Sequence, residues 1–361
     1  MNQKKSAVFI VLGVILLFII AGCKGEKGPA GAPTTPFLGG TKGLEIGFIE
    51  GMPPDEVTDG KTFEFQAMIR LKNLGEHDLL ETDQVKVDLI GILPSDFGAD
   101  SSELTDREPE DELTARKRGP EGDIIEPTET YIIFPGDNDY FNFGGSIAGN
   151  TPFIFRADVC YKYQTDAVSE VCVLGNMIDV ADDAICRPSE PKTVFNSGSP
   201  VQVTAFRQSV VGRQKIQFSF DIVHSGSGTI FDSTDDADCP KESSSRRTKE
   251  DSIMVIVDTG LPGTLNCAGL GGSSSIQRGF VKLVGGKRTI TCTQILNEVG
   301  DYKKAVDITL EFNYLDSVDK EILVKHLLDE AAYGSSDGSC GDGYCDDTED
   351  EDEDSCPEDC S

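Results

Sequence analysis

The sequence predicts an all-β protein built from two tandem antiparallel β-sandwiches, followed by a small disulfide-stapled module at the carboxyl end. Three observations predict this architecture. Apolar residues alternate with polar ones at period two, the alternating runs recur after about 150 residues, and no run before residue 319 has helical periodicity. Such alternation buries one face of a strand and leaves the other in water, as in antiparallel sandwiches.

The internal repeat contains two clusters of strands. In the first cluster, an alternating run ends at Asn73-Leu74-Gly75, and the same pattern ends 151 residues later at His224-Ser225-Gly226. The second cluster aligns Phe155, Ala157, Val159 and Tyr161 with Ile308, Leu310, Phe312 and Tyr314. A repeat of this length predicts two structural units of one kind. We place the first sandwich at residues 42–195 and the second at residues 198–325.

Short strands separated by Gly, Pro and Asn make each unit resemble an immunoglobulin-like sandwich, although the chain has no tryptophan. Two segments carry a narrower resemblance: Gly43-Leu44-Glu45-Ile46-Gly47-Phe48 with Met52-Pro53-Pro54-Asp55, and Leu71-Lys72-Asn73-Leu74-Gly75. They resemble the CARDB-like adhesion modules of archaeal and bacterial surface proteins. The resemblance implies a stalk or adhesive role and carries over no catalytic residue.

The first 22 residues predict a secretory signal peptide, because two lysines precede an apolar run of sixteen residues. Ile20-Ala21-Gly22-Cys23 resembles a lipobox, which implies cleavage before Cys23 and lipidation of that cysteine. Two acyl chains would anchor the protein stably. The alternative is an uncleaved signal anchor. In both cases we expect the chain at the extracellular face of the membrane, with residues 23–41 as a Pro/Gly-rich linker.

Charge and cysteine content narrow the partners and the compartment. The chain has 63 acidic and 32 basic residues, a formal net charge of −31, so it should repel phosphate backbones. We therefore expect no nucleic-acid partner. Eleven cysteines indicate an oxidising compartment.

Ten cysteines are disulfide candidates once Cys23 is set aside: Cys160, Cys172, Cys186, Cys239, Cys267, Cys292, Cys340, Cys345, Cys356 and Cys360. Each sandwich holds three of them, so complete oxidation requires a bridge between the sandwiches or to the tail. We expect a hairpin loop at residues 165–167, which would place Cys160 opposite Cys172 and leave Cys186 to reach the second sandwich. The alternative is local pairing of Cys172 with Cys186 and of Cys267 with Cys292.

Two acidic, Ser-rich inserts interrupt the repeat at residues 101–121 and 232–251. Their composition offers little apolar surface to bury, so we expect mobile loops. A recognition loop at a sandwich end is the alternative, since binding residues concentrate on loops.

After a linker at residues 326–338, an acidic Cys-rich module fills residues 339–361. Cys340-Gly341-Asp342-Gly343-Tyr344-Cys345 and Cys356-Pro357-Glu358-Asp359-Cys360 resemble the C-G-D-G-x-C…C-P-x-D-C modules of microbial surface proteins. So short a segment needs disulfide staples, because it cannot build a core. Its clustered carboxylates suit calcium, and the expected ligands are Asp342, Glu349 and Asp359. Zinc on the cysteines and a solvated acidic tail are the alternatives.

No catalytic constellation is recognisable. His77, His224 and His326 are isolated, and the chain has no nucleophile elbow or P-loop. We expect no enzyme activity and no cofactor other than calcium. The sequence predicts a membrane-anchored surface protein with a structural or adhesive role, whose partner is a cell-surface protein or a glycan. A calcium- or solute-binding lipoprotein is the alternative.

Overall fold

The protein is an all-β sandwich, which confirms the predicted fold class. The computed structural model describes residues 35–327 except residues 235, 273 and 274. Its largest sheet has nine strands: β2 (Glu56–Thr58), β5 (Val85–Ile90), β10 (Thr151–Val173), β11 (Phe195–Asn196), β14 (Thr229–Asp232), β15 (Ser252–Asp258), β17 (Gly271–Gly272), β18 (Ile276–Lys282) and β20 (Tyr302–Lys325).

Two smaller sheets pack against this large sheet. One contains β1 (Leu44–Phe48), β4 (Ala67–Asn73) and β8 (Glu129–Phe134), and the other contains β12 (Val201–Gly212), β13 (Lys215–His224), β19 (Lys287–Leu296) and β16 (Gly263–Cys267). Two further pairs are β3 (Glu64–Phe65) with β9 (Phe141–Asn142) and β6 (Lys117–Arg118) with β7 (Ile124–Ile125). Among the described residues the helical elements are α2 (Ser243–Lys249) and the 3₁₀ turns η1 (Thr82–Gln84), η2 (Pro94–Phe97) and η3 (Ser101–Glu103).

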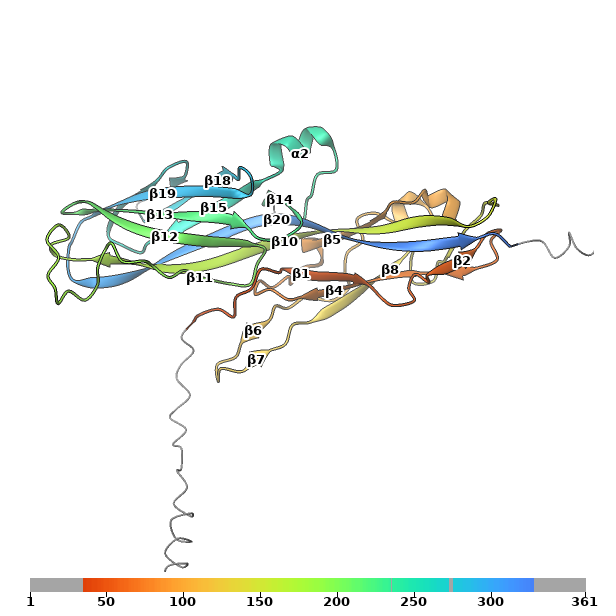
Figure 1. Ribbon diagram of the computed structural model, residues 1–361, viewed down its shortest axis with the longest axis horizontal. Helices are drawn as coiled ribbons and strands as arrows, with labels where there is room; N and C mark the ends of the chain where they lie inside the picture. The colour runs from red at the N-terminus through yellow and green to blue at the C-terminus, as the bar shows by residue number, and fades with distance from the viewer. Residues whose placement is uncertain (1–34, 235, 273–274, 328–361) are drawn as a thin grey trace, which may run out of the picture.

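Two long strands form a spine through the whole body. β10 has 23 residues and β20 has 24, and they pair antiparallel from Thr151 with Val324 to Val173 with Tyr302. At about 3.3 Å per residue, the spine is about 75 Å long. Figure 1 shows β10 and β20 side by side along the body, with β12, β13 and β19 over one end and β2, β5 and β8 at the other.

The spine divides the body into two halves that share strands. The first half carries the β1-β4-β8 sheet and the second half carries the β12-β13-β19-β16 sheet. The end of β20 belongs to the first half, because Leu323 pairs with Glu56 of β2. The end of β10 belongs to the second half, because Val168 pairs with Phe195 of β11. The boundaries predicted at 195 and 198 therefore do not separate the halves, since each long strand crosses from one to the other.

A pseudo-two-fold axis relates the halves. The register pairs Lys162 with Asn313, and these residues are also 151 positions apart, the offset of the first repeat cluster. We call the level of this pair the waist. The same offset makes Tyr163 equivalent to Tyr314, so the predicted alignment of Tyr161 with Tyr314 is wrong by two residues. A shift of two keeps every side chain on its face of the sheet, which is why alternation alone did not detect it.

The predicted hairpin at residues 165–167 is also wrong, because β10 stays extended there. Asp166 pairs with Thr309 in the middle of the β10–β20 ladder. The chain has no Gly or Asn at residues 165–167 to adopt the positive φ that tight hairpins favour. Thr165 takes an inward position and is fully buried, donating its hydroxyl to Val201 O at 2.7 Å.

The cores are rich in phenylalanine. In the first half, Phe97 lies edge-on to Phe155 with ring centroids 5.1 Å apart. In the second half, Phe206 stacks on Phe218 at 5.3 Å. Aromatic rings bury large apolar areas, so these clusters fill the interior of a chain that has no tryptophan.

Candidate functional site

One cavity lies beside the waist, on the outer face of the large sheet. Its volume is about 880 Å³. β5, β10 and β20 form its floor through Asp88, Asp158 and Leu315. Its cover is residues 236–251, which we call the strap; this segment belongs to the second half by sequence and lies over strands of the first (Figure 1).

The strap is attached to the first half by a disulfide and by two ion pairs of Lys241. Cys239 forms a disulfide with Cys160 of β10, with Cα atoms 5.8 Å apart. Lys241 Nζ lies 2.7 Å from Asp88 Oδ2 and 3.7 Å from Asp106 Oδ1. The insert predicted as a mobile loop at 232–251 is therefore attached at several points and contains helix α2.

Charges of both signs line this cavity. Burial acts to lower the pKa of Lys241, but its hydrogen bond to Asp88 and the negative charges of Asp88 and Asp106 outweigh burial, so the pKa is raised. Lys249 pairs with Asp238 at 2.7 Å, and that hydrogen bond raises the pKa of the lysine. The cavity can thus offer carboxylate and ammonium groups to a polar ligand, while the pairs named here hold the strap in place.

The structure corrects the predicted disulfide pairing. Cys160 pairs with Cys239, so the Cys160–Cys172 bridge is wrong. The alternative of local pairing is confirmed, since Cys172 pairs with Cys186 and Cys267 with Cys292. A bridge does connect the two sequence units, but it uses Cys160 in place of Cys186. Cys160 and Cys172 both lie on the face of β10 opposite to its inward residues. Each pairs with a different segment that lies over this face, Cys160 with the strap and Cys172 with the segment around Cys186.

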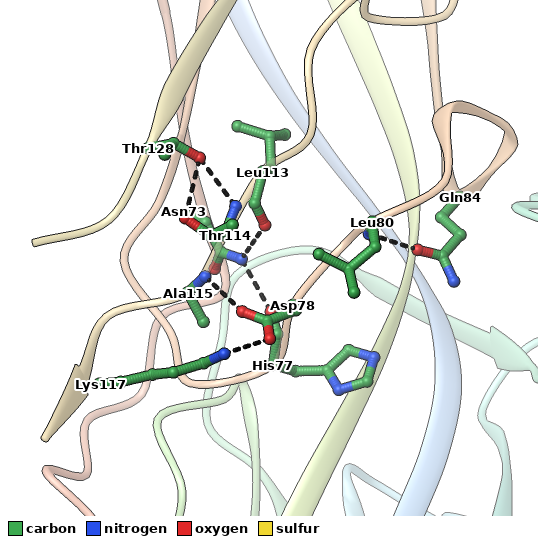
Figure 2. A network of polar contacts seen from close by, with 10 residues as sticks. All are labelled: Asn73, His77, Asp78, Leu80, Gln84, Leu113, Thr114, Ala115, Lys117 and Thr128. Carbon is green, nitrogen blue, oxygen red and sulfur yellow. Dashed lines mark hydrogen bonds and ion pairs between the residues drawn. The ribbon is translucent and has the colours of Figure 1, made fainter. Parts of the chain in front are cut away.

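A second polar site lies at the corner after β4, where it holds the acidic insert of the first half (Figure 2). Asn73, fully buried, donates from Nδ2 to His77 O at 2.7 Å and to Leu113 O at 3.0 Å. Asp78 accepts from the Ala115 N–H at 2.8 Å. Asp78 also forms an ion pair with Lys117 and Thr128 Oγ1 accepts from the Thr114 N–H, as Figure 2 shows.

The acidic insert at 101–121 therefore packs on the sandwich, contrary to the predicted mobile loop. Leu104, Leu113 and Ala115 are each 1% exposed. In the sequence each of these is a single apolar residue among polar ones. Isolated apolar residues form no periodic pattern, so the packing of this insert could not be predicted from periodicity.

The third polar site surrounds the point where the chain leaves β20. Asp59 is buried and accepts from His326 Nδ1 at 2.7 Å, from Leu327 N at 3.0 Å and from Ile147 N at 3.1 Å. These bonds, that of His326 first, lower the pKa of Asp59 to about 2. Asp59 was not among the predicted site residues, because 267 residues separate it from His326 in the chain.

The other two histidines also have structural contacts. His77 lies edge-on to Tyr163, and burial lowers the pKa of its imidazole. His224 Nε2 lies 3.0 Å from Tyr314 Oη, and burial lowers its pKa as well. None of these contacts joins two of the three histidines.

Several predicted site residues lie outside the described residues. They are the lipidation site Cys23, the expected calcium ligands Asp342, Glu349 and Asp359, and the tail cysteines Cys340, Cys345, Cys356 and Cys360. Within residues 35–327, as far as the structure describes them, no three His, Cys, Asp or Glu residues are grouped so that they could hold a metal ion. No helix in this part of the chain has the length and apolarity needed to cross a membrane.

Comparison with known proteins found no matching protein-family model and no matching curated protein. The resemblance to CARDB-like modules and to the C-G-D-G-x-C module therefore stays a prediction.

Proposed function

We propose that this chain is a non-enzymatic, membrane-anchored extracellular surface protein that works as a stiff structural and interaction module. The amino-terminal lipid on Cys23 tethers it, and the folded body holds binding surfaces away from the membrane. A partner is a cell-surface protein or a glycan. CARDB-like surface modules, which the first half resembles in sequence, would have the same kind of role.

One observation carries the proposal: the β10–β20 ladder continues for 23 residue pairs through both halves. A flexible linker between tandem domains would let the halves swing. Here the halves can separate only if backbone hydrogen bonds of the ladder break. Continuity of this kind favours a spacer that transmits position and force.

The positions of the two chain ends support the same role. Gly39 N–H donates to Glu76 at 2.7 Å, near the waist, so the tether would join the body near its middle. The chain leaves β20 twelve residues beyond Asn313, about 40 Å away at 3.3 Å per residue. The described chain therefore ends at the tip of the first half, while the second half extends on the other side of the waist as a free arm.

The test is expression of the full chain and of Cys23→Ser in a host that processes lipoproteins. We expect the wild type in the membrane fraction, cut before Cys23, carrying lipid mass and digestible by protease on intact cells. Cys23→Ser should lose the lipid mass. A wild-type chain that stays inside the cell with free thiols would overturn the anchoring part of the proposal.

The interaction role is tested separately with beads that carry the mature chain. We expect these beads to bind cells or immobilised cell-surface glycans. Beads that carry the same chain after reduction and alkylation are the control, because they keep the composition and charge but lose the disulfides. Equal binding by both kinds of bead would mean that the folded surface is not responsible.

A further inference from the structure

The pseudo-symmetry of the two halves identifies a groove that is filled in one half and open in the other. In the first half, Ile46 of β1 pairs with Leu71 of β4. In the second half, Val203 of β12 pairs with Ile222 of β13, and Ile222 lies 151 residues after Leu71. Ile46 and Val203 are therefore equivalent. By the same offset, Val318 of β20 is equivalent to Ala167 of β10.

In the second half, β11 closes the seam between the two sheets. Its residues Phe195 and Asn196 pair with Val168 and Ala167 on the edge of β10. The side-chain amide of Asn196 then bridges to β12, accepting from Val203 N at 2.8 Å and donating to Val203 O at 2.9 Å. One short extended segment thus satisfies backbone groups on both sides of the seam.

In the first half the same seam is open. On the side of β20 away from β10, β14 pairs as far as Leu315 and β2 begins at Leu323. Among the described residues no strand pairs with 316–322 on that side. A groove of about 450 Å³ lies there, lined by β1, by residues 316–318 and by Tyr161 and Tyr314.

The backbone of β20 is oriented to pair in this groove. Leu323 N–H donates to Asp55 O at 2.8 Å, which shows that its peptide groups point away from β10. Residues two apart in a strand share this direction, so Ser317 and Asp319 also present their peptide groups to the open side. Ser317 N–H meets only the carboxylate of its own neighbour, Asp316, at 3.0 Å among the bonds described.

Side-chain burial shows what the open groove lacks. Val203 is fully buried and Ala167 is 1% exposed, because β11 covers them. Their equivalents Ile46 and Val318 are only half-buried. A strand added at this seam would cover both side chains and extend the ladder.

The chain does not supply this strand from the equivalent position. Residues 38–39 correspond to β11, but they turn away from the groove. Leu38 N–H and Gly39 N–H both donate to the carboxylate of Glu76, at 2.8 and 2.7 Å. Two carboxylates line the groove, Glu45 and Asp316. Glu45 lies 4.0 Å from Lys42 Nζ and 3.1 Å from Arg70 Nη2, whereas Asp316 accepts only from the Ser317 N–H among the bonds described.

We propose that this groove accepts an extended, basic segment of a partner protein by β-strand addition, with a side-chain amide that bridges to Ile46 as Asn196 bridges to Val203. The carboxylate of Asp316 and the net charge of −31 favour a basic segment, and the same net charge disfavours a second copy of this chain. The main chain supplies affinity in this mode, and the bridging amide adds specificity. The inference rests on the proposed interaction role and names the surface that performs it.

The probe is a capped peptide with the sequence of residues 192–199, which contains the Phe-Asn pair of β11 and one lysine. It is titrated to millimolar concentration into the mature, folded chain and followed by amide chemical shifts and hydrogen exchange. We expect saturable binding, weaker at high salt, with new protection of the Asp319 amide. A peptide with Ala in place of Asn should bind about tenfold more weakly, since it lacks both bridging hydrogen bonds.

Two variants of the protein test the site. Asp319→Pro removes the N–H that faces the groove and leaves the β10 ladder intact, as edge strands allow. Asp319→Ala is the matched control, because it removes the same carboxylate and keeps the N–H. We expect the proline variant to lose binding and the alanine variant to retain it. No shift at millimolar peptide, equal binding by both variants, or protection at Val168 instead of Asp319 would overturn the proposal, whether or not Cys23 is lipidated.

Discussion

Tyr163 donates its hydroxyl to Oδ1 of Asn73 at 3.0 Å, although 90 residues separate them in the sequence. Tyr314 and His224 repeat this contact at 3.0 Å with the same separation of 90 residues. Each pair joins the end of a strand in a small sheet to a long strand of the spine. The repeated contact shows that the two halves share a joint at the waist.

Replacing Tyr163 by Phe should destabilise the protein by about 1–3 kcal/mol, because the buried Oδ1 of Asn73 would lose its partner. Burial raises the pKa of Tyr163, so the hydroxyl stays protonated and the loss should not depend on pH below 9. Denaturant unfolding measures the change. Tyr140→Phe is the control, since Tyr140 is 47% exposed, and it should change stability by less than about 0.5 kcal/mol. Equal effects of both substitutions would mean that the hydrogen bond between Tyr163 and Asn73 does not stabilise the protein.

The Cys160–Cys239 bridge should be the first of the described disulfides to be reduced. Cys239 is half-buried at the wall of the large cavity, whereas the cysteines of the other two described bridges are at most 5% exposed. Mild dithiol treatment without denaturant, followed by alkylation and peptide mapping, should label Cys160 and Cys239 before the other four. Simultaneous labelling of all six would contradict this order.

Loss of that bridge should also weaken the fold. It closes a loop with a sequence separation of 79, and a bridge of this kind typically contributes about 2–4 kcal/mol. The double substitution Cys160→Ser with Cys239→Ser should lower the free energy of unfolding by this amount. Lys241→Met is the matched control for the strap, because it keeps the bridge and removes only the two ion pairs of an exposed lysine, each worth about 1 kcal/mol or less.

The fold class could be predicted because period-two alternation is a local property of the chain. The crossing of the long strands could not. Thr165 and Ser169 occupy inward positions of β10, where polar residues made the alternating run look broken. Their partners are Ser199 Oγ for Thr165 and Thr193 O for Ser169, each at least 24 residues away. A buried hydroxyl is tolerated only with such partners, and sequence does not show where they lie.

The candidate sites were predictable only in part, for the same reason. Cysteine parity required a bridge between the sequence units or to the tail, and a bridge between units was found. Its partners depend on the strap lying over β5 and β10, which no local pattern encodes. The groove beside β1 could not be predicted from the sequence. It exists because β11 closes the seam in the second half, whereas the equivalent residues 38–39 of the first half bond to Glu76 and leave the seam open.

The two halves should move as one body. Nitroxides on unnatural amino acids at Ile125 and Val284, exposed residues of the first and second halves, should give one narrow distance distribution. A pair within the second half, Ile178 and Val284, gives the width that the labels themselves contribute. A distribution between halves much broader than this control would contradict a continuous spine and favour a hinge.

The tail should bind calcium if its carboxylates are gathered by disulfides. Native mass spectrometry of the oxidised mature chain should retain one calcium ion, and a chain ending at residue 338 should retain none. Substituting Asn for Asp342 and Asp359 and Gln for Glu349 should abolish retention while leaving the cysteines unchanged. Bound zinc with free tail thiols would contradict the disulfide-stapled module.

The chain exit at His326 should respond to acid through Asp59. The pKa of Asp59 is about 2 in the folded protein, below its usual value of 3.8, and the hydrogen bond from His326 is the main cause. A depressed pKa means that the carboxylate stabilises the fold at pH above 4 and that this contribution is lost as the pH falls through 2. Asp59→Asn should therefore be less stable than the wild type at pH 5, and the difference should shrink toward pH 2.

Hydrogen exchange at the Leu327 and Ile147 amides measures this effect locally, because both donate to Asp59. In the wild type their protection should fall between pH 4 and pH 2, after correction for intrinsic exchange rates. His326→Gln is the matched control: it can keep a hydrogen-bond donor near Asp59 but carries no charge, so it should raise the pKa of Asp59 only part of the way toward 3.8. If the stability difference between wild type and Asp59→Asn were the same at pH 5 and pH 2, the carboxylate would not be the group that holds the end of β20.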